Sequence, residues 1–129
     1  MLQRVLETVL YYDEEEPMRR FYEERLGMRP IGAEPGRFLF YRAGESVFLL
    51  FQRERALAQS HLPPHGTRGP GHTCFQVAES DYEGWKRSLA ESGVELGPEV
   101  EWPGGRRSFY FEDPAGNQLE IADGDFWPD

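Results

Sequence analysis

A carboxylate near the amino end lies where apolar side chains are expected. Glu7 belongs to the β-rich run 4–12, and strand alternation puts it on one face with Val5, Val9 and Tyr11. An unpaired carboxylate in such surroundings is costly, because a charged group loses hydration there. Glu7 therefore needs a counter-charge, a proton, a metal ion or a water-filled cavity.

A second carboxylate follows an apolar hairpin near the other end. The stretch 108–121 reads as strand, turn and strand, with the turn supplied by the sequence DPAGN at 113–117. Glu120 lies between Leu119 and Ile121, so its side chain takes the face opposite those two. It points either into water or into a site.

Other polar and aromatic residues could complete such a site. His72 opens an expected strand at 71–77, where an isolated histidine is more often a surface or hydrogen-bonded residue than a ligand. His65 is only seven residues earlier and could reach the same region. Ser108 and Tyr110 share one strand face and could line a cavity, whereas Trp127 could cover core, a partner subunit or a ligand.

Composition limits the classes of function. The chain of 129 residues is long enough for one domain, and its formal charge of −9 argues against nucleic acid and anionic membranes as partners. The longest apolar run, 47–51, is far too short to span a membrane, and no signal peptide is recognisable. Cys74 is the only cysteine, so no internal disulfide can form and we expect a cytoplasmic protein.

The elements that position these residues occur in two similar series. The first module covers about 4–52, with a strand, a helix introduced by the capping-box pair Asp13 and Glu16, and strands near 28–32, 37–43 and 46–52. We expect the segment 53–70 to be an irregular linker, because proline, histidine and glycine accumulate in it.

The second module, about 71–122, repeats the first. Its helix begins at the capping-box pair Ser80 and Glu83, and strands follow near 94–100, 106–112 and 117–122, before a tail at 123–129. Superposing the modules equates Glu7 with His72 and Glu120 with Leu50.

Three sequence features together resemble the vicinal oxygen chelate superfamily, which includes glyoxalases, extradiol dioxygenases and bleomycin-resistance proteins. They are the motif DPAGN-x-x-E ending at Glu120, the pair Gly71-His72, and the helix carrying Phe21-Tyr22 and Leu26-Gly27. The resemblance implies an α+β fold, with two tandem βαβββ modules forming a cup-shaped, eight-stranded mixed sheet in a single domain.

The resemblance also implies a site. In metal-using members, four corners of the cup hold a divalent ion that grips two adjacent substrate oxygens; this chain keeps Glu7, His72 and Glu120 and has Leu50 at the fourth. A histidine with two carboxylates suits Fe, Mn, Ni or Zn and leaves positions for substrate. Glu7 or Glu120 would carry protons, and Leu50, His65, Ser108, Tyr110 and Trp127 would line the pocket.

A second function remains open at this point. Bleomycin-resistance members use the same cup without metal to sequester a cationic drug, and the charge of −9 and the apolar Leu50 fit such a binder. Under either interpretation the resemblance implies a small-molecule ligand and a homodimer. A third possibility is a degenerate member that serves as a protein-interaction module, which neither metals nor organic cations would stabilise.

Overall fold

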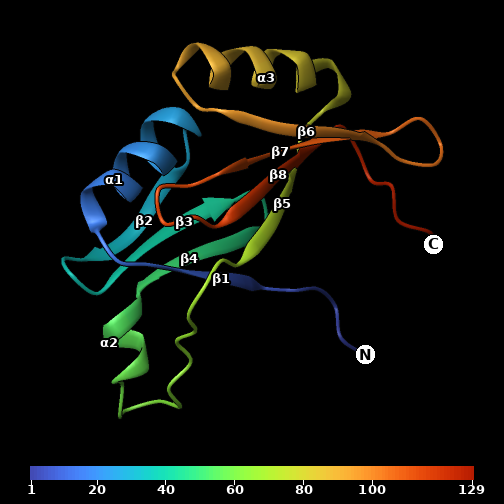
Figure 1. The fold of residues 1–129 in the computed structure, drawn as a ribbon. Coiled ribbons are helices and arrows are strands. Elements are labelled where there is room, and N and C mark those ends of the chain that lie inside the picture. Colours follow the sequence, from blue (N-terminus) through green and yellow to red (C-terminus); the bar gives the residue numbers. More distant parts are fainter. The chain divides into compact units, whose positions relative to one another are not determined.

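The computed structural model describes all residues 1–129, which divide into two compact units (Figure 1). Unit 1 comprises Met1–Gly71 and unit 2 comprises His72–Asp129. Each unit contains one βαβββ series, so the predicted α+β fold with tandem modules is confirmed. No helix is long and apolar enough to cross a membrane.

Unit 1 contains four strands and three short helical segments. A continuous helical stretch is formed by α1 (Glu15–Arg19) and the π-helical η1 (Arg20–Arg25), and Gly27 ends it with a φ of 64°. The strands and the remaining helix are β1 (Glu7–Tyr12), β2 (Arg29–Glu34), β3 (Phe38–Ala43), β4 (Ser46–Gln52) and α2 (Arg53–Leu57).

Unit 2 follows the same order with one longer helix. A 3-10 turn, η2 (Glu79–Asp81), leads into α3 (Tyr82–Glu91), and Gly93, with a φ of 91°, follows its end. The strands are β5 (His72–Gln76), β6 (Leu96–Glu101), β7 (Arg107–Glu112) and β8 (Gln118–Ala122). The observed strands overlap all eight expected ones.

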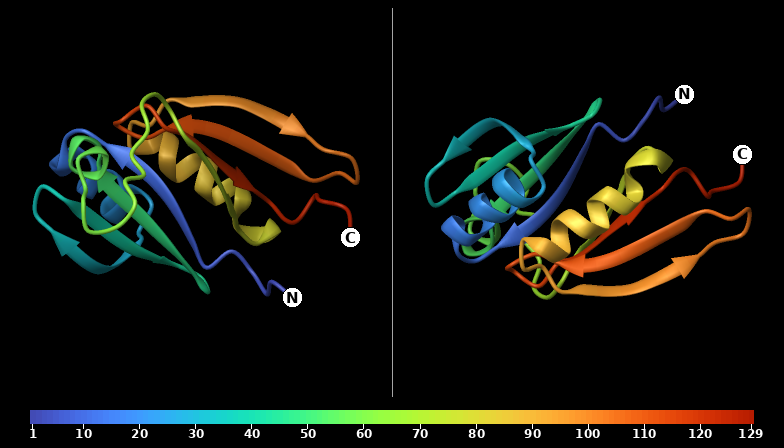
Figure 2. Two further views of the ribbon diagram at one scale, coloured as in Figure 1. Left: turned by 90° about the horizontal axis from the view of Figure 1, so that it is seen from below. Right: turned by 90° about the horizontal axis from the view of Figure 1, so that it is seen from above.

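The two units share one strand-pairing scheme. The sheet orders are β1-β4-β3-β2 in unit 1 and β5-β8-β7-β6 in unit 2, with the first pair parallel and the others antiparallel. In each unit the helix lies along one face of its own sheet (Figure 2). We call that the helix face, and the opposite one the outer face.

Aromatic packing joins each helix to its sheet. Tyr22 is fully buried, with its ring centroid 6.0 Å from that of Tyr41 and 5.2 Å from that of Phe48. In unit 2, Tyr82 has the same role against Phe109 at 5.5 Å. The helix faces therefore hold the cores.

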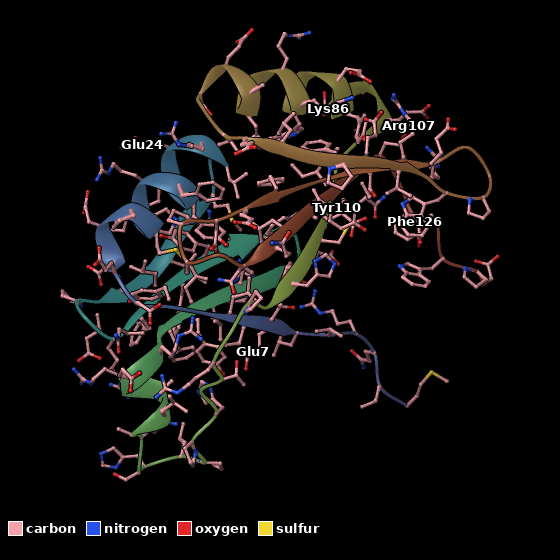
Figure 3. The ribbon with its side chains drawn as sticks, in the orientation of Figure 1. Glu7, Glu24, Lys86, Arg107, Tyr110 and Phe126 are labelled. Carbon is pink, nitrogen blue, oxygen red and sulfur yellow. The ribbon has the colours of Figure 1, made fainter.

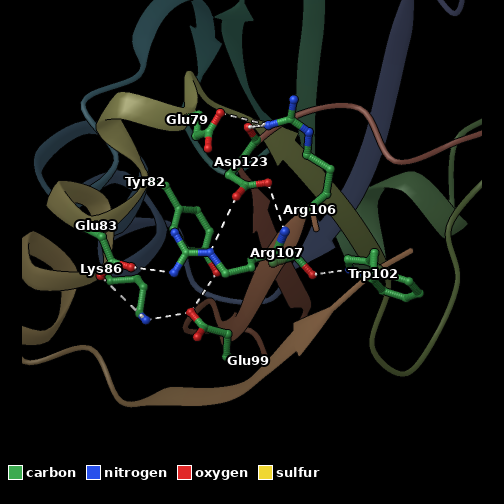
Figure 4. A network of polar contacts seen from close by, with 10 residues as sticks. Glu79, Tyr82, Glu83, Lys86, Glu99, Trp102, Arg106, Arg107 and Asp123 are labelled. Atoms are coloured by element: carbon green, nitrogen blue, oxygen red, sulfur yellow. Dashed lines mark hydrogen bonds and ion pairs between the residues drawn. The ribbon is translucent and has the colours of Figure 1, made fainter. Parts of the chain in front are cut away.

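Polar contacts also hold α3 in place. The Arg107 guanidinium lies 4.5 Å from the Tyr82 ring centroid and donates a hydrogen bond of 2.8 Å to Glu83 (Figure 4). Its Nε lies 3.6 Å from Oδ2 of the buried Asp123. Arg107, the first residue of β7, thus links α3 to β7 and to the segment after β8.

Neither expected capping box forms. Asp13 accepts a hydrogen bond from Arg53 instead, and Glu83 accepts one from Arg107, while no side chain caps α1 or α3. These two carboxylates therefore bind arginines distant in sequence instead of capping their helices. This difference leaves the positions of the helices unchanged.

The linker is more ordered than its composition predicts. Its first residues form α2, where the Gln52 side chain accepts a hydrogen bond from the Arg55 backbone N–H. Residues 65–68 contact the rest of unit 1, and Arg68 Nη1 lies 2.9 Å from Glu54 Oε1. His65 contacts Tyr11, a Cβ on Gly66 would lie 2.5 Å from Leu57 Cγ, and the Thr67 carbonyl accepts a hydrogen bond from buried Arg53.

Candidate functional site

The outer face of unit 2 brings two of the predicted site residues together. His72 and Glu120 lie on adjacent strands, with His72 Nε2 3.3 Å from Glu120 Oε1. The Glu120 residue is only 3% exposed, and its Oε2 is buried without a hydrogen-bond partner. A buried carboxylate oxygen without a donor is costly, so this position calls for a proton or a cation.

The backbone fixes the orientation of His72. Its Nδ1 lies 2.9 Å from the Gln118 carbonyl oxygen, which can only accept, so Nδ1 carries the hydrogen. In a neutral imidazole, Nε2 then presents its lone pair toward Glu120. Two acceptor atoms 3.3 Å apart need a shared proton or cation between them. A histidine ligand held by a backbone carbonyl is a common arrangement in metal sites.

The DPAGN turn determines where β8 begins. Asp113 and Asn117 are both buried, and Asp113 Oδ1 accepts hydrogen bonds from the backbone N–H groups of Ala115 and Asn117. The Asn117 side chain donates a third, of 2.8 Å, to Asp113 Oδ2. The next residue, Gln118, orients His72 through its carbonyl group. The motif therefore positions the His72–Glu120 pair.

Cys74 and Tyr110 flank Glu120 on neighbouring strands. Desolvation, followed by the negative charge of Glu120, raises the pKa of the Cys74 thiol to about 12. The same two causes raise the pKa of Tyr110. Tyr110 also lies along the His72 ring, with centroids 6.1 Å apart. Both groups therefore stay protonated at neutral pH and add no negative charge beside the carboxylate.

Ser108 and the tail lie further along this face. Ser108 is fully buried and accepts a hydrogen bond of 2.9 Å from Trp102 Nε1. The Trp102 ring stacks on Phe126 with centroids 4.6 Å apart. Trp127 contacts Phe126 but is 74% exposed. The predicted pocket residues Ser108 and Trp127 thus belong to an aromatic group at the end of the sheet.

Glu7 occupies the first position of β1 in unit 1. It is exposed (Figure 3), and its side chain forms no hydrogen bond or ion pair. Its strand partner is Val47. His72 holds the same first position in unit 2, paired with Gln118. The predicted equivalence of Glu7 and His72 therefore agrees with the pairing.

The equivalence of Glu120 with Leu50 is wrong by one residue. Cys74 pairs with Glu120, and Val9, two residues after Glu7, pairs with Leu49. The counterpart of Glu120 is thus Leu49. Leu50 is fully buried on the helix face beside Leu39, because successive strand residues point to opposite faces.

His65 contacts the outer face of unit 1. Its Nδ1 lies 2.7 Å from the Tyr11 hydroxyl oxygen, and its ring meets the Phe51 ring edge-on at 4.8 Å. The linker thus places His65 on this sheet, as the sequence allowed. Within neither unit do three His, Cys, Asp or Glu side chains gather closely enough to hold a metal ion.

Comparison with known proteins gives the family. The model described as the Glyoxalase/Bleomycin resistance protein/Dioxygenase superfamily matches residues 4–121. The chain belongs to this superfamily. The resemblance to vicinal oxygen chelate proteins is thereby confirmed. A search of curated proteins finds no match.

Solved structures of the superfamily support the assignment. Lactoylglutathione lyase from Agrobacterium tumefaciens is 29% identical with a TM-score of 0.93, over 99% of this chain and 98% of that chain. A glyoxalase-related enzyme from Fulvimarina pelagi is 26% identical with a TM-score of 0.76, over 98% and 92%. The fosfomycin resistance protein FosX from Mesorhizobium loti, at 21% identity, a TM-score of 0.69 and coverages of 97% and 95%, shares the fold.

Proposed function

We propose that this superfamily member is a divalent-metal-dependent enzyme of the glyoxalase or dioxygenase type, acting on a small molecule through two adjacent oxygens. The observation that carries the proposal is the pair of His72 Nε2 and Glu120 Oε1, 3.3 Å apart beside a buried and unpartnered carboxylate oxygen. These donors fit a divalent ion such as Fe, Mn, Ni or Zn. The lactoylglutathione lyase neighbour supports the reaction class.

The chain's own residues would divide the work. His72, Glu120 and Glu7 would hold the ion, which when bound acts as a Lewis acid on substrate oxygens. Glu7, exposed and unpaired, would exchange protons readily with a substrate. Glu120 would exchange a proton with the substrate only if its carboxylate moves away from the His72 imidazole. Tyr110, the strand partner of Glu120, would form one side of the substrate's binding position.

The assembly is part of the proposal. Because Glu7 belongs to unit 1 and the other two ligands to unit 2, the set is completed either within one chain or across a homodimer. We propose the homodimer, in the cytoplasm, with the whole chain acting as one functional domain.

Metal content tests the proposal directly. Purified protein loaded separately with Fe, Mn, Ni or Zn is dialysed and analysed for bound metal, and lactoylglutathione lyase activity is measured. We expect His72→Ala and Glu120→Gln to lose the metal and Glu7→Gln to bind it more weakly. Glu24→Gln, at an exposed helical position that forms no ion pair, is the matched control. Unchanged metal content in His72→Ala and Glu120→Gln would exclude the proposed site.

One observation favours a metal-free binder as the second candidate. The outer face of unit 1 carries clustered aromatic rings, with Phe38 and Phe40 stacked at 4.1 Å. Apolar surfaces with a few placed polar groups are ordinary small-molecule sites, so binding there requires no catalysis. A melting-temperature screen separates the two functions: metals would stabilise the enzyme, whereas only organic ligands would stabilise the binder.

A further inference from the structure

The outer face of unit 1 has an aromatic end. Phe38 pairs with Phe51 across β3 and β4, and Phe51 pairs with Tyr11 of β1. Phe40 stacks on Phe38 and meets Phe51 edge-on at 5.4 Å. All four rings are half-buried, so part of each remains open to a ligand. His65 stands against Phe51 and Tyr11 and bounds the group on that side.

The same face has a cationic end. Arg42 follows Phe40 by two residues in β3 and therefore shares its face, about 7 Å further along the strand. Arg29 of β2 is its direct strand partner. Two like charges directly opposite each other destabilise a sheet. Neither arginine forms an ion pair, although the chain carries 23 acidic residues and Arg42 is half-buried.

The aromatic end and the cationic end together indicate which kind of ligand would fit this face. A planar carboxylate matches the forked donors of arginine, and two unpaired guanidinium groups side by side are relieved by one shared anion. A flat ring offers stacking and edge contacts to Phe38, Phe40 and Phe51. The spacing requires both groups in one small molecule, because they are separated by one strand repeat of about 7 Å.

We propose that the outer face of unit 1 binds a small aromatic carboxylate, with its anionic group at Arg29 and Arg42 and its ring on Phe38, Phe40 and Phe51. As a substrate class this inference rests on the proposed function, but binding itself requires no metal. The proposed ligand has the opposite charge to the one that the net charge of the chain would favour. A chain with a formal charge of −9 attracts cations in general, whereas this face selects an anion.

Calorimetric titration of the full, metal-free chain tests the site. The probes are 2-naphthoate, the neutral 2-naphthalenemethanol, the cationic 2-naphthylmethylammonium and the non-aromatic cyclohexanecarboxylate. We expect 2-naphthoate to bind at least about tenfold more tightly than the other three, because each of them lacks either the negative charge or the aromatic ring. Equal affinity for the three naphthyl compounds would overturn the proposal.

Variants separate the two ends of the site. Arg42→Gln should weaken 2-naphthoate about tenfold or more and leave the neutral alcohol within about twofold. Phe40→Leu, which keeps an apolar side chain, should weaken both. Arg87→Gln, at an exposed arginine of α3 that also forms no ion pair, is the matched control and should change neither.

Two further results would also refute the site, and both are independent of the metal. One is 2-naphthoate affinity unchanged in Arg42→Gln with its melting temperature retained. The other is no naphthoate binding together with a dimer that Phe40→Leu dissociates, because the rings would then belong to a contact with a second copy. Glu7 lies in the same cross-strand row, because Val47 pairs with both Glu7 and Arg42. Since the titration uses the metal-free chain, loss of metal binding in His72→Ala or Glu120→Gln would leave the naphthoate result unaffected.

Discussion

The outer faces of the two sheets have the same pairing and opposite chemistry. The row of Cys74, Glu120 and Tyr110 in unit 2 corresponds to Val9, Leu49 and Phe40 in unit 1. One row surrounds a buried carboxylate with polar groups, whereas the other is apolar throughout. Strand order and register are therefore independent of what a face does, and one scaffold supports a polar face and an aromatic one.

The helix faces differ much less. Each centres on a fully buried tyrosine of the helix, Tyr22 or Tyr82, packed on aromatic strand residues. Both units must bury an apolar helix face to fold, but neither needs a particular outer face. The two units are thus alike on the faces that folding requires to be buried and differ on the outer faces.

The largest expected effect comes from making unit 2 resemble unit 1. Glu120→Leu should abolish metal binding and lower any metal-dependent activity by about a thousandfold or more, because the ion contributes several kcal/mol to the reaction. Stability in urea should stay equal or rise, since an unpartnered buried oxygen is removed. Metal analysis and urea denaturation measure both. A variant that keeps its metal would break the comparison.

The reverse exchange should damage folding. Leu49→Glu places a carboxylate among Val9 and Phe40 without a histidine partner. We expect a loss of about 4 kcal/mol in the free energy of unfolding. Leu49→Gln serves as the uncharged control and should cost less. Equal losses in the two variants would show that shape, not charge, distinguishes the rows.

The turns before the last strands provide a smaller contrast. Asp113→Ala removes three hydrogen bonds made by a buried carboxylate and should cost about 3 kcal/mol in unit 2. Glu45→Ala in the corresponding turn of unit 1 removes only a surface ion pair of 3.7 Å to Arg4 and should be nearly neutral. Urea denaturation compares the two. In Asp113→Ala, His72 should also lose its single tautomer, visible in imidazole nitrogen NMR.

The smallest expected effect is a change in how the stability of the protein depends on pH in the acidic range. Mainly the hydrogen bond from Lys86, and secondarily that from Tyr82, hold the pKa of Glu99 below its ordinary value. The stabilisation is therefore present above the ordinary carboxyl pKa and is lost as pH falls through the lowered one. Glu99→Gln should flatten the melting temperature against pH in that acidic range. The same slope in both proteins would exclude this group as the cause.

Most of the fold was predictable from sequence, because its local signals were strong. Alternation, turn residues and the internal repeat located the eight strands and both main helices. The register in which the strands pair was harder to predict from sequence. The run 47–51 is apolar on both faces, so alternation could not tell Leu49 from Leu50. Cys74 as a neighbour of Glu120 likewise required the parallel register of β5 and β8.

Caps and site residues were predicted unevenly for a similar reason. Asp13 and Glu83 had the right spacing for local caps, but arginines distant in sequence are their partners. The contact between His72 and Glu120 followed from the repeat together with the family resemblance. The cationic pair of Arg29 and Arg42 has no sequence signal, because only strand pairing makes these residues adjacent.

Contacts of residues 65–68 with the rest of unit 1 divide the linker into a held part and a freer part. The exposed stretch 60–64 has only a local hydrogen bond, from the Gln59 side chain to the Pro63 carbonyl. Proteases should therefore cut there first, and added residues should be tolerated best there. A nick at that point would leave the downstream portion held by Tyr11, Leu57 and Arg53. The long connection would then behave as a short tether that begins only after Arg68, which pairs with Glu54 of α2.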